Sequence, residues 1–432
     1  MTELILIVAI LGYLGVILES PLKVNKTITA VFTGALCWIM YGFFTYDGTS
    51  LVADKLISSF GEIAGVLFFL LGAMTIVELI DLHKGFSVII HRIRTKSVFK
   101  LLWIIGLLAF FLSSILDNLA TTIIMVTILN KLLPKGEIRM TLAGIVVIAA
   151  NAGGAFSPIG DITTTLLWVG GQISAAGVIK TLFFPSLVAA LVPIFIAGFR
   201  LRGNAALRSQ LSMERALKEE KERGSKRILF MGVLSLLMVP VIKTLTGLPP
   251  FIGVFLGLAM VSMMSEFIHF KKSTEEKRIY SVSYALSKVD ISSIFYFAGI
   301  LLLVYVLEEI HLLGSLADFL IHNLPSLDFM VIAIGLMSAI IDNGSLIAAT
   351  QGMFSLSTYP TDSYLWDFLA LSAGIGGSLL IIGSASGVAI MEKEKISFMW
   401  YLKKISPLAF AGFIASIAAF LLQSKMVEWL SL

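Results

Sequence analysis

The stretch Ser113-Ser114-Ile115-Leu116-Asp117-Asn118 places a carboxylate and an amide in the middle of an apolar segment that runs from 99 to 133. Asp and Asn are strong helix N-caps, so this pair can end one helix and begin the next. The arms on either side have roughly 14–18 residues, which is short for a membrane span of about 20. The sequence therefore predicts a helical hairpin over 99–133 with Asp117 and Asn118 at its tip.

The same pattern returns in the second half of the chain, as Ser338-Ala339-Ile340-Ile341-Asp342-Asn343 within the apolar segment 328–358. A glycine pair follows each Asp-Asn pair, Gly153-Gly154 in one half and Gly376-Gly377 in the other. The chain therefore contains an internal repeat with a second hairpin over 328–358. We place the first repeat at 1–200 and the second at 228–432.

The composition indicates a membrane protein. Of 432 residues, 57% are hydrophobic and only 14% are charged, whereas a soluble protein keeps about a quarter of its residues charged. A single cysteine, Cys37, excludes a disulfide framework and a zinc cluster. The apolar N-terminus lacks a basic region and a cleavage motif, so it is predicted to be a span. The sequence contains no phosphate-binding GxxxxGK[ST] motif, so it gives no indication of an ATP-driven motor.

Apolar runs predict the spans. Uninterrupted spans are expected near 4–18, 28–46, 61–80, 181–199, 228–246, 251–268, 290–310 and 405–424. Two further segments, 138–170 and 365–391, are apolar but interrupted by glycines and small polar residues, which predicts broken spans. The expected fold is an all-α polytopic membrane protein with five spans, one hairpin and broken helices in each half.

The distribution of lysine and arginine gives the orientation. Basic residues gather in segments that should face the cytoplasm, namely 83–100, 131–139, 200–227, 269–288 and 393–404. Both termini then lie outside, and five crossings per half make the second repeat inverted. Segment 201–227 is predicted to be a cytoplasmic helix that links the halves, with partner docking as the alternative. Inverted repeats with discontinuous helices mark secondary transporters, whose sites lie at the breaks.

The first broken span should supply oxygen ligands. Asn151 and Gly153-Gly154 precede Pro158, which removes an amide donor and prevents a continuous helix. Asp161, Thr163 and Thr164 follow and add a carboxylate and hydroxyls, which suit a hard cation.

The second broken span is less acidic. It carries Ser378 and Ser384, which are also predicted to be ion-binding residues, and Ser384 stands where the first half has Asp161. The two predicted sites are therefore unequal, and we expect Na⁺ to bind in the first, at Asp117, Asn118, Asp161 and Thr164. No lysine or arginine lies at the breaks, which favours a cation over an organic anion. Carboxylates that bind either Na⁺ or H⁺ produce antiport by competition.

These motifs resemble the NhaD-type Na⁺/H⁺ antiporters of the ion transporter superfamily over essentially the full chain. The resemblance rests on the stretches 113–122, 151–165 and 338–343, with Gly-Gly-Ser at 376–378 and Gly-Ser-Ala-Ser-Gly at 383–387. It implies a homodimeric exchanger of Na⁺ or Li⁺ for H⁺ in a bacterial inner membrane, with an elevator-like transport domain. The ion-binding residues it implies are Asp117, Asn118, Asn151, Asp161, Thr163, Thr164, Ser338, Asp342 and Asn343. One departure is Gly344-Ser345, where family members carry an apolar residue and Pro.

Two alternative functions remain open on the sequence alone. A Na⁺-coupled organic-anion or arsenite carrier of the same superfamily is the first, although related dicarboxylate carriers use Ser-Asn-Thr at the hairpin tips. An intramembrane aspartyl protease is the second, but its Tyr-Asp and Gly-x-Gly-Asp motifs are absent. We expect no enzyme activity, no cofactor and no nucleic-acid partner. The expected partners are Na⁺, Li⁺, H⁺ and membrane lipid.

Overall fold

A computed structural model describes residues 2–19, 23–45, 51–90, 95, 97–201 and 224–431. Within these ranges the chain forms helices joined by turns, and no strand occurs in them. Most of the predicted linker helix at 201–227 lies outside the described residues, as do His91, Arg92, Arg94 and Lys96 of the predicted cytoplasmic segment.

Eight of the described helices are long and apolar enough to cross a membrane. They are α3 (Lys26–Phe44), α4 (Leu51–Leu82), α6 (Val98–Leu116), α10 (Ala175–Leu201), α12 (Ser225–Thr246), α13 (Pro250–Ile268), α16 (Ile291–Glu309) and α23 (Ser406–Ser431). Large apolar side chains such as Phe43, Leu245 and Phe267 are at least three-quarters exposed, at 78%, 80% and 76%. Apolar surface of this extent requires an apolar surrounding, so the protein is a multi-pass membrane protein.

Shorter helices complete the part of the chain that the structure describes. They are α1 (Thr2–Ile17), α5 (Ser87–Ile90), α7 (Asn118–Leu132), α8 (Glu137–Gly154), α9 (Ile162–Val169), α14 (Thr274–Arg278), α15 (Val282–Leu286), α17 (Leu312–Asn323), α18 (Leu327–Met337), α19 (Asn343–Met353), α20 (Tyr364–Gly376), α21 (Ala385–Glu394) and α22 (Phe398–Lys404).

The predicted spans agree with the long helices except at the N-terminus. Seven of the eight uninterrupted spans coincide with α3, α4, α10, α12, α13, α16 and α23. The segment 4–18 forms α1, which has only 16 residues and falls short of a full span. In contrast, α6 has 19 residues and is long enough to cross, so the first hairpin arm is longer than predicted.

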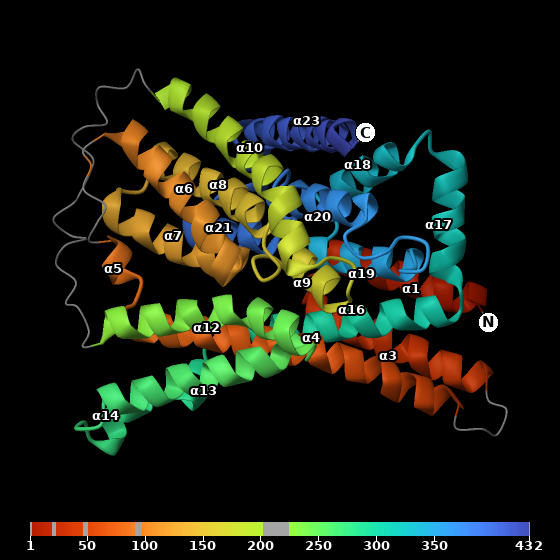
Figure 1. Cartoon of the computed structure of the whole chain (residues 1–432), viewed down its shortest axis with the longest axis horizontal. Helices are drawn as coiled ribbons and strands as arrows, with labels where there is room; N and C mark the ends of the chain where they lie inside the picture. Colours follow the sequence, from red (N-terminus) through yellow and green to blue (C-terminus); the bar gives the residue numbers. More distant parts are fainter. Residues whose placement is uncertain are drawn as a thin grey trace.

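The helices pack as two bundles (Figure 1). We call α1, α3, α4, α12, α13 and α16 the scaffold bundle, which occupies the lower part of the view. We call α6–α10, α18–α21 and α23 the broken-helix bundle, which lies above it. Within the scaffold bundle, α3 packs along α16 and α13 packs along α4. The Trp38 indole donates to the Leu302 carbonyl at 2.8 Å and fixes α3 on α16.

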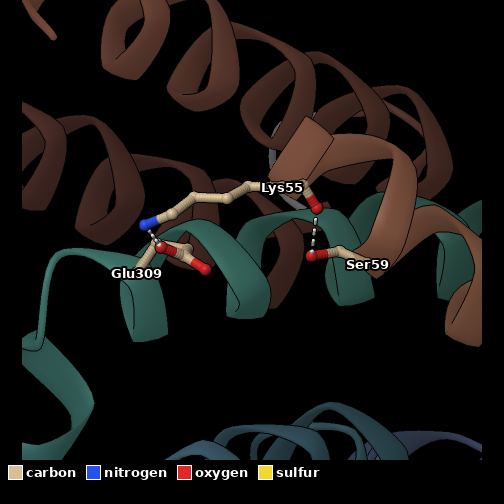
Figure 2. A network of polar contacts seen from close by, with 3 residues as sticks. All are labelled: Lys55, Ser59 and Glu309. Carbon is tan, nitrogen blue, oxygen red and sulfur yellow. Dashed lines mark hydrogen bonds and ion pairs between the residues drawn. The ribbon is translucent and has the colours of Figure 1, made fainter. Parts of the chain in front are cut away.

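A polar contact joins α4 to α16 at the end of the scaffold bundle (Figure 2). The Lys55 ammonium donates to the Glu309 carboxylate, and the Ser59 hydroxyl donates to the Lys55 carbonyl at 3.0 Å. Both charged side chains are about one-third exposed, at 37% and 27%. The pair therefore joins the two helices near the surface, where an ion pair contributes about 0–1 kcal/mol to the free energy of unfolding.

Two glycines bring helices of the broken-helix bundle into backbone contact. A Cβ at Gly153 of α8 would lie 2.0 Å from the Phe110 carbonyl oxygen of α6. A Cβ at Gly376 of α20 would lie 2.0 Å from the Gly335 carbonyl oxygen of α18. Only glycine permits this approach, because the atom met in each case is backbone and cannot move aside as a side chain would.

The chain leaves the helical conformation at four places in this bundle. Asp117 separates α6 from α7, and residues 155–161 separate α8 from α9. Residues 338–342 separate α18 from α19, and residues 377–384 separate α20 from α21. Helix ends expose backbone amides and carbonyls that have no partner within the helix, and these four ends carry the polar side chains of the site.

Candidate functional site

A cavity of about 90 Å³ lies between the two bundles. The scaffold wall comes from α3, α4, α12 and α16, and its polar members are Lys26, Ser293 and Tyr296. The opposite wall comes from the four helix breaks, and its polar members are Asp117, Asn118, Asp161, Thr165, Asp342 and Asn343. This volume holds several water molecules or a small hydrated ion.

Asp117 forms the corner between α6 and α7. Its backbone has φ 78°, which is a left-handed conformation that a non-glycine residue rarely adopts. The Asp117 Oδ1 atom accepts a hydrogen bond from the Ala120 backbone amide at 2.7 Å and so caps α7. The positive end of α7 therefore stabilises the carboxylate, and the half-buried side chain borders the cavity.

Asp161 caps α9 in the same way and is also held from the other half of the chain. The Thr163 backbone amide donates to Asp161 Oδ1 at 3.3 Å. The Asn343 amide Nδ2 donates to both carboxylate oxygens of Asp161, each at 3.2 Å. Asp161 and Asn343 are both almost fully buried. The tip of α19 thus orients the carboxylate at the start of α9.

Asp342 has the least constrained carboxylate of the three. It precedes α19 but makes no side-chain cap hydrogen bond. Its Oδ2 atom is buried and has no hydrogen-bond partner among the described residues. Asp342 therefore presents an oxygen that can bind a proton or a cation in the cavity.

A buried chain of amides connects the first hairpin tip to the second broken span. The Asn118 amide donates to Asn151 Oδ1 at 3.0 Å, and the Asn151 amide donates to Ser384 Oγ at 3.1 Å. Ser384 in turn caps α21 by accepting from the Gly387 amide at 3.3 Å. Asn151 and Ser384 do not line the cavity, so their contacts position Asn118.

Thr163 and Thr164 of the first break lie behind the cavity wall. The Thr164 hydroxyl is within hydrogen-bond distance of the carbonyls of Gly154, Ser157 and Asp161, at 3.3, 2.6 and 3.1 Å. It ties the two ends of the break together. The Thr163 hydroxyl is buried without a hydrogen-bond partner in the described part of the chain.

Ser338 and Ser378 serve the backbone of the second break. The Ser338 hydroxyl donates to the Ala373 carbonyl at 2.8 Å, and the Ser378 hydroxyl donates to the Ile375 carbonyl at 2.7 Å. Neither residue lines the cavity. Of the predicted ion-binding residues, the structure therefore brings Asp117, Asn118, Asp161, Asp342 and Asn343 to the cavity. It places the other six behind them.

The three aspartates do not converge on one point. Among the described residues, no three His, Cys, Asp or Glu side chains lie close enough together to hold a metal ion. A cation in this cavity would therefore be held by at most two of the three carboxylates and would complete its shell with amide, hydroxyl, carbonyl or water oxygens. The two sites predicted from the repeat also share this one cavity, since it contains carboxylates from both halves.

Lys26 is a cavity residue that the sequence patterns did not identify. No lysine or arginine lies at the helix breaks themselves, as the sequence indicates, but Lys26 reaches the same cavity from the opposite wall. The shortness of α1 was the available signal. α1 has only 16 residues, fewer than the about 20 of a full span, and Lys26 is the first residue of the next described helix, α3.

Comparisons with known proteins identify related membrane transporters. The family model described as Citrate transporter (CitMHS) matches residues 5–367. Sodium/proton antiporter 1 of Arabidopsis thaliana is 43% identical over 412 residues, which cover 95% of this chain and 70% of that protein. The Na⁺/H⁺ antiporter NhaD of Vibrio cholerae is 31% identical over 446 residues, with 96% and 91% covered. The YdaH transporter of Alcanivorax borkumensis has a solved structure with a TM-score of 0.55 at 10% identity, covering 87% of this chain and 88% of that one. That likeness concerns the fold alone.

Proposed function

We propose that this chain, which belongs to the citrate transporter (CitMHS) family, exchanges Na⁺ for H⁺ across a membrane. Within that family its relatives are NhaD-type sodium/proton antiporters. It is a secondary transporter and not an enzyme. The observation that carries the proposal is the cavity between the two bundles, where Asp117, Asp161 and Asp342 line the wall formed by the helix breaks. Ionisable groups at membrane depth are costly and mark ion and proton pathways.

The geometry supports exchange by competition. Asp161 is oriented by Asn343, and Asp117 is oriented by the first turn of α7. A carboxylate fixed in this way can bind Na⁺ or H⁺ but not both, so the arrival of one ion releases the other. We infer that Na⁺ binds at Asp117, Asn118, Asp161 and Thr164. The first three of these line the cavity.

We further propose that the chain is an inverted repeat of 1–200 and 228–432, joined by a linker at 201–227. Two correspondences support this division. Gly153 meets the Phe110 carbonyl as Gly376 meets the Gly335 carbonyl, and α3 packs on α16 as α13 packs on α4. Each half would then contribute one hairpin, α6–α7 or α18–α19, and one broken span. The broken-helix bundle would move against the scaffold bundle to alternate access, as in an elevator-like carrier.

The resemblance to the bacterial antiporters supports three narrower proposals. These are a location in a bacterial inner membrane, a homodimeric assembly and transport of Li⁺ beside Na⁺. Relatives from both bacteria and plants match the chain at full length, so the location depends on the source of the chain. Flotation of membrane fractions, crosslinking of purified protein and Li⁺-driven exchange would test them separately.

Reconstituted vesicles test the main proposal. Purified protein is placed in liposomes with an acidic interior and a pH-sensitive dye, and NaCl is then added outside. Exchange predicts alkalinisation of the interior that saturates with Na⁺ and that choline chloride does not produce. The apparent half-saturation for Na⁺ should fall as external pH rises, because fewer protons compete for the carboxylate. The absence of any Na⁺-dependent pH change would disprove the proposal.

Sodium-coupled uptake of a carboxylate anion is the second candidate, because the matching family model is described as a citrate transporter. The cavity opposes it. Three carboxylates and a single ammonium line the described wall, so an organic trianion would meet a net negative surface. Vesicles with a Na⁺ gradient and labelled citrate separate the two candidates, and we expect no accumulation above that of protein-free vesicles.

A further inference from the structure

Lys26 faces the carboxylates from the opposite wall of the cavity. It is the first residue of α3, and its side chain borders the same space as Asp117, Asp161 and Asp342. Among the described residues that line this space, Lys26 is the sole basic one. The expected ion chemistry does not use it, because a fixed cation opposes the binding of a mobile one.

The ammonium of Lys26 has a defined place. Its Nζ atom lies 4.5 Å from the centroid of the Tyr296 ring, a cation–π contact. The Tyr296 hydroxyl shares a hydrogen bond of 2.8 Å with the Ser345 hydroxyl on α19. Ser345 lies in the first turn after Asp342 and Asn343. The Tyr296 ring therefore holds the ammonium beside the tip of α19.

The lysine belongs rigidly to the scaffold bundle. The Thr27 hydroxyl contacts the Ser292 carbonyl at 3.0 Å and the Ser292 hydroxyl at 2.8 Å, which joins the start of α3 to the start of α16. The Asn25 side chain caps α3 by accepting from the Thr27 amide at 2.8 Å. Glu19 accepts from the Lys26 backbone amide at 3.1 Å, so its carboxylate also serves the helix end.

No ion pair fixes the ammonium on any of the three aspartates in the described structure, where the ion pairs lie elsewhere. Asp342 Oδ2 has no hydrogen-bond partner among the described residues. The ammonium and this oxygen thus border one cavity of about 90 Å³ from opposite bundles, and the space between them is where a transported cation would sit.

We propose that Lys26 is a tethered counter-cation that competes with Na⁺ for the cavity carboxylates and so sets the Na⁺ affinity of the carrier. This inference rests on the proposed Na⁺/H⁺ exchange. When the site is empty, Lys26 compensates the carboxylates through the intervening space. When Na⁺ enters, repulsion between the two cations weakens binding and favours release. The residue is a determinant of affinity and binds no Na⁺ itself.

The first test measures Na⁺ binding independently of transport. The thermal unfolding midpoint of purified protein is followed as NaCl replaces choline chloride at constant ionic strength. Lys26→Gln removes one positive charge from the wall of the cavity in which Na⁺ would bind. We expect this loss of repulsion to lower the half-saturating Na⁺ concentration on the order of tenfold. Lys26→Arg keeps the charge and should stay within about twofold of the unaltered protein. Lys23→Gln removes an exposed lysine that lies three residues before Lys26 and outside α3, and it is the matched control.

A second variant separates charge from folding. Lys26→Cys is made in the chain whose one native cysteine, Cys37, is fully buried, so reagent acts at position 26. Modification with an aminoethyl thiosulfonate restores an ammonium and should return the half-saturation to that of the unaltered protein. Modification with the uncharged methyl reagent should leave it low.

The outcomes distinguish this inference from the function beneath it. One outcome is that the unaltered protein exchanges Na⁺ for H⁺, but Lys26→Gln and Lys26→Cys modified with the methyl reagent bind Na⁺ with the same half-saturation as the unaltered protein. In that case Lys26 does not set the Na⁺ affinity, and this inference fails while the proposed function stands. If the unaltered protein neither binds Na⁺ nor exchanges it in vesicles, the proposed function fails and this inference fails with it. Binding that tightens without Lys26 and is reversed by aminoethylation supports it.

Discussion

The amide of Asn343 donates hydrogen bonds to both carboxylate oxygens of Asp161, each at 3.2 Å, across 182 positions of the sequence. The two residues belong to different broken elements, α19 and the start of α9. The contact fixes the plane of the carboxylate and leaves lone pairs on both oxygens for a further ligand. It also makes the orientation of the Asp161 carboxylate at one break depend on the position of Asn343 at the other.

Replacement of this amide should weaken Na⁺ binding. In Asn343→Ala the buried Asp161 carboxylate loses two hydrogen bonds, and each bond to a charged group contributes about 1.5–3 kcal/mol. We expect the half-saturating Na⁺ concentration for exchange to rise by about tenfold or more. Asn323→Ala removes an exposed amide on α17 and should leave it unchanged. Equal half-saturation in both variants would show that the contact does not orient the site.

Neutralisation of Asp117 should abolish exchange while the fold is kept. Asn is as good an N-cap as Asp, so Asp117→Asn retains the contact to the Ala120 amide and the start of α7. It removes the charge that Na⁺ and H⁺ share, and we expect exchange to fall at least about a hundredfold, because an ionisable group at membrane depth marks the ion pathway. Asp318→Asn on the exposed face of α17 is the control. Full exchange by a well-folded Asp117→Asn protein would remove Asp117 from the site.

The positions of the helix breaks followed from local chemistry. Glycine pairs, Pro158 and the two Asp-Asn pairs lie in segments that are otherwise apolar, and each disfavours a continuous helix for its own reason. The structure has helix ends at these residues. Such features depend on a few neighbouring residues, so one sequence is enough to predict them.

The pairing of the breaks could not be predicted in this way. The repeat aligns Asp161 with Ser384, which suggested two separate sites, but Asp161 is bonded to Asn343 and Ser384 to Asn151. These partners meet because α9 packs on α19 and α21 packs on α8, and such tertiary contacts leave no mark in residue spacing. The position of Lys26 in the cavity could not be predicted for the same reason, since it depends on how the start of α3 lies relative to the helix breaks.

The close approach of α8 to α6 predicts a sharp effect at Gly153. In Gly153→Ala the new Cβ would lie 2.0 Å from the Phe110 carbonyl oxygen, and backbone must move to admit it. Overpacking of this kind costs about 1–3 kcal/mol or more, so the thermal unfolding midpoint in detergent should fall. At Gly61 of α4 a Cβ meets nothing within 4 Å, and Gly61→Ala should stabilise by about 0.5–1 kcal/mol. A Gly153→Ala protein as stable as Gly61→Ala would contradict this packing.

The ion pair between Arg139 and Glu394 should matter far more than the pair beside it. Arg139 Nε donates to Glu394 Oε2 at 2.9 Å, and the Glu394 side chain is fully buried. Arg139→Ala leaves that carboxylate uncompensated and should cost about 3–5 kcal/mol of unfolding free energy. Lys404 pairs with Glu137 at 3.0 Å, but both side chains are more than half exposed, so Lys404→Ala should cost at most about 1 kcal/mol. Unfolding midpoints of the two variants in one detergent compare them directly, and equal losses would mean that burial does not decide the strength of these pairs.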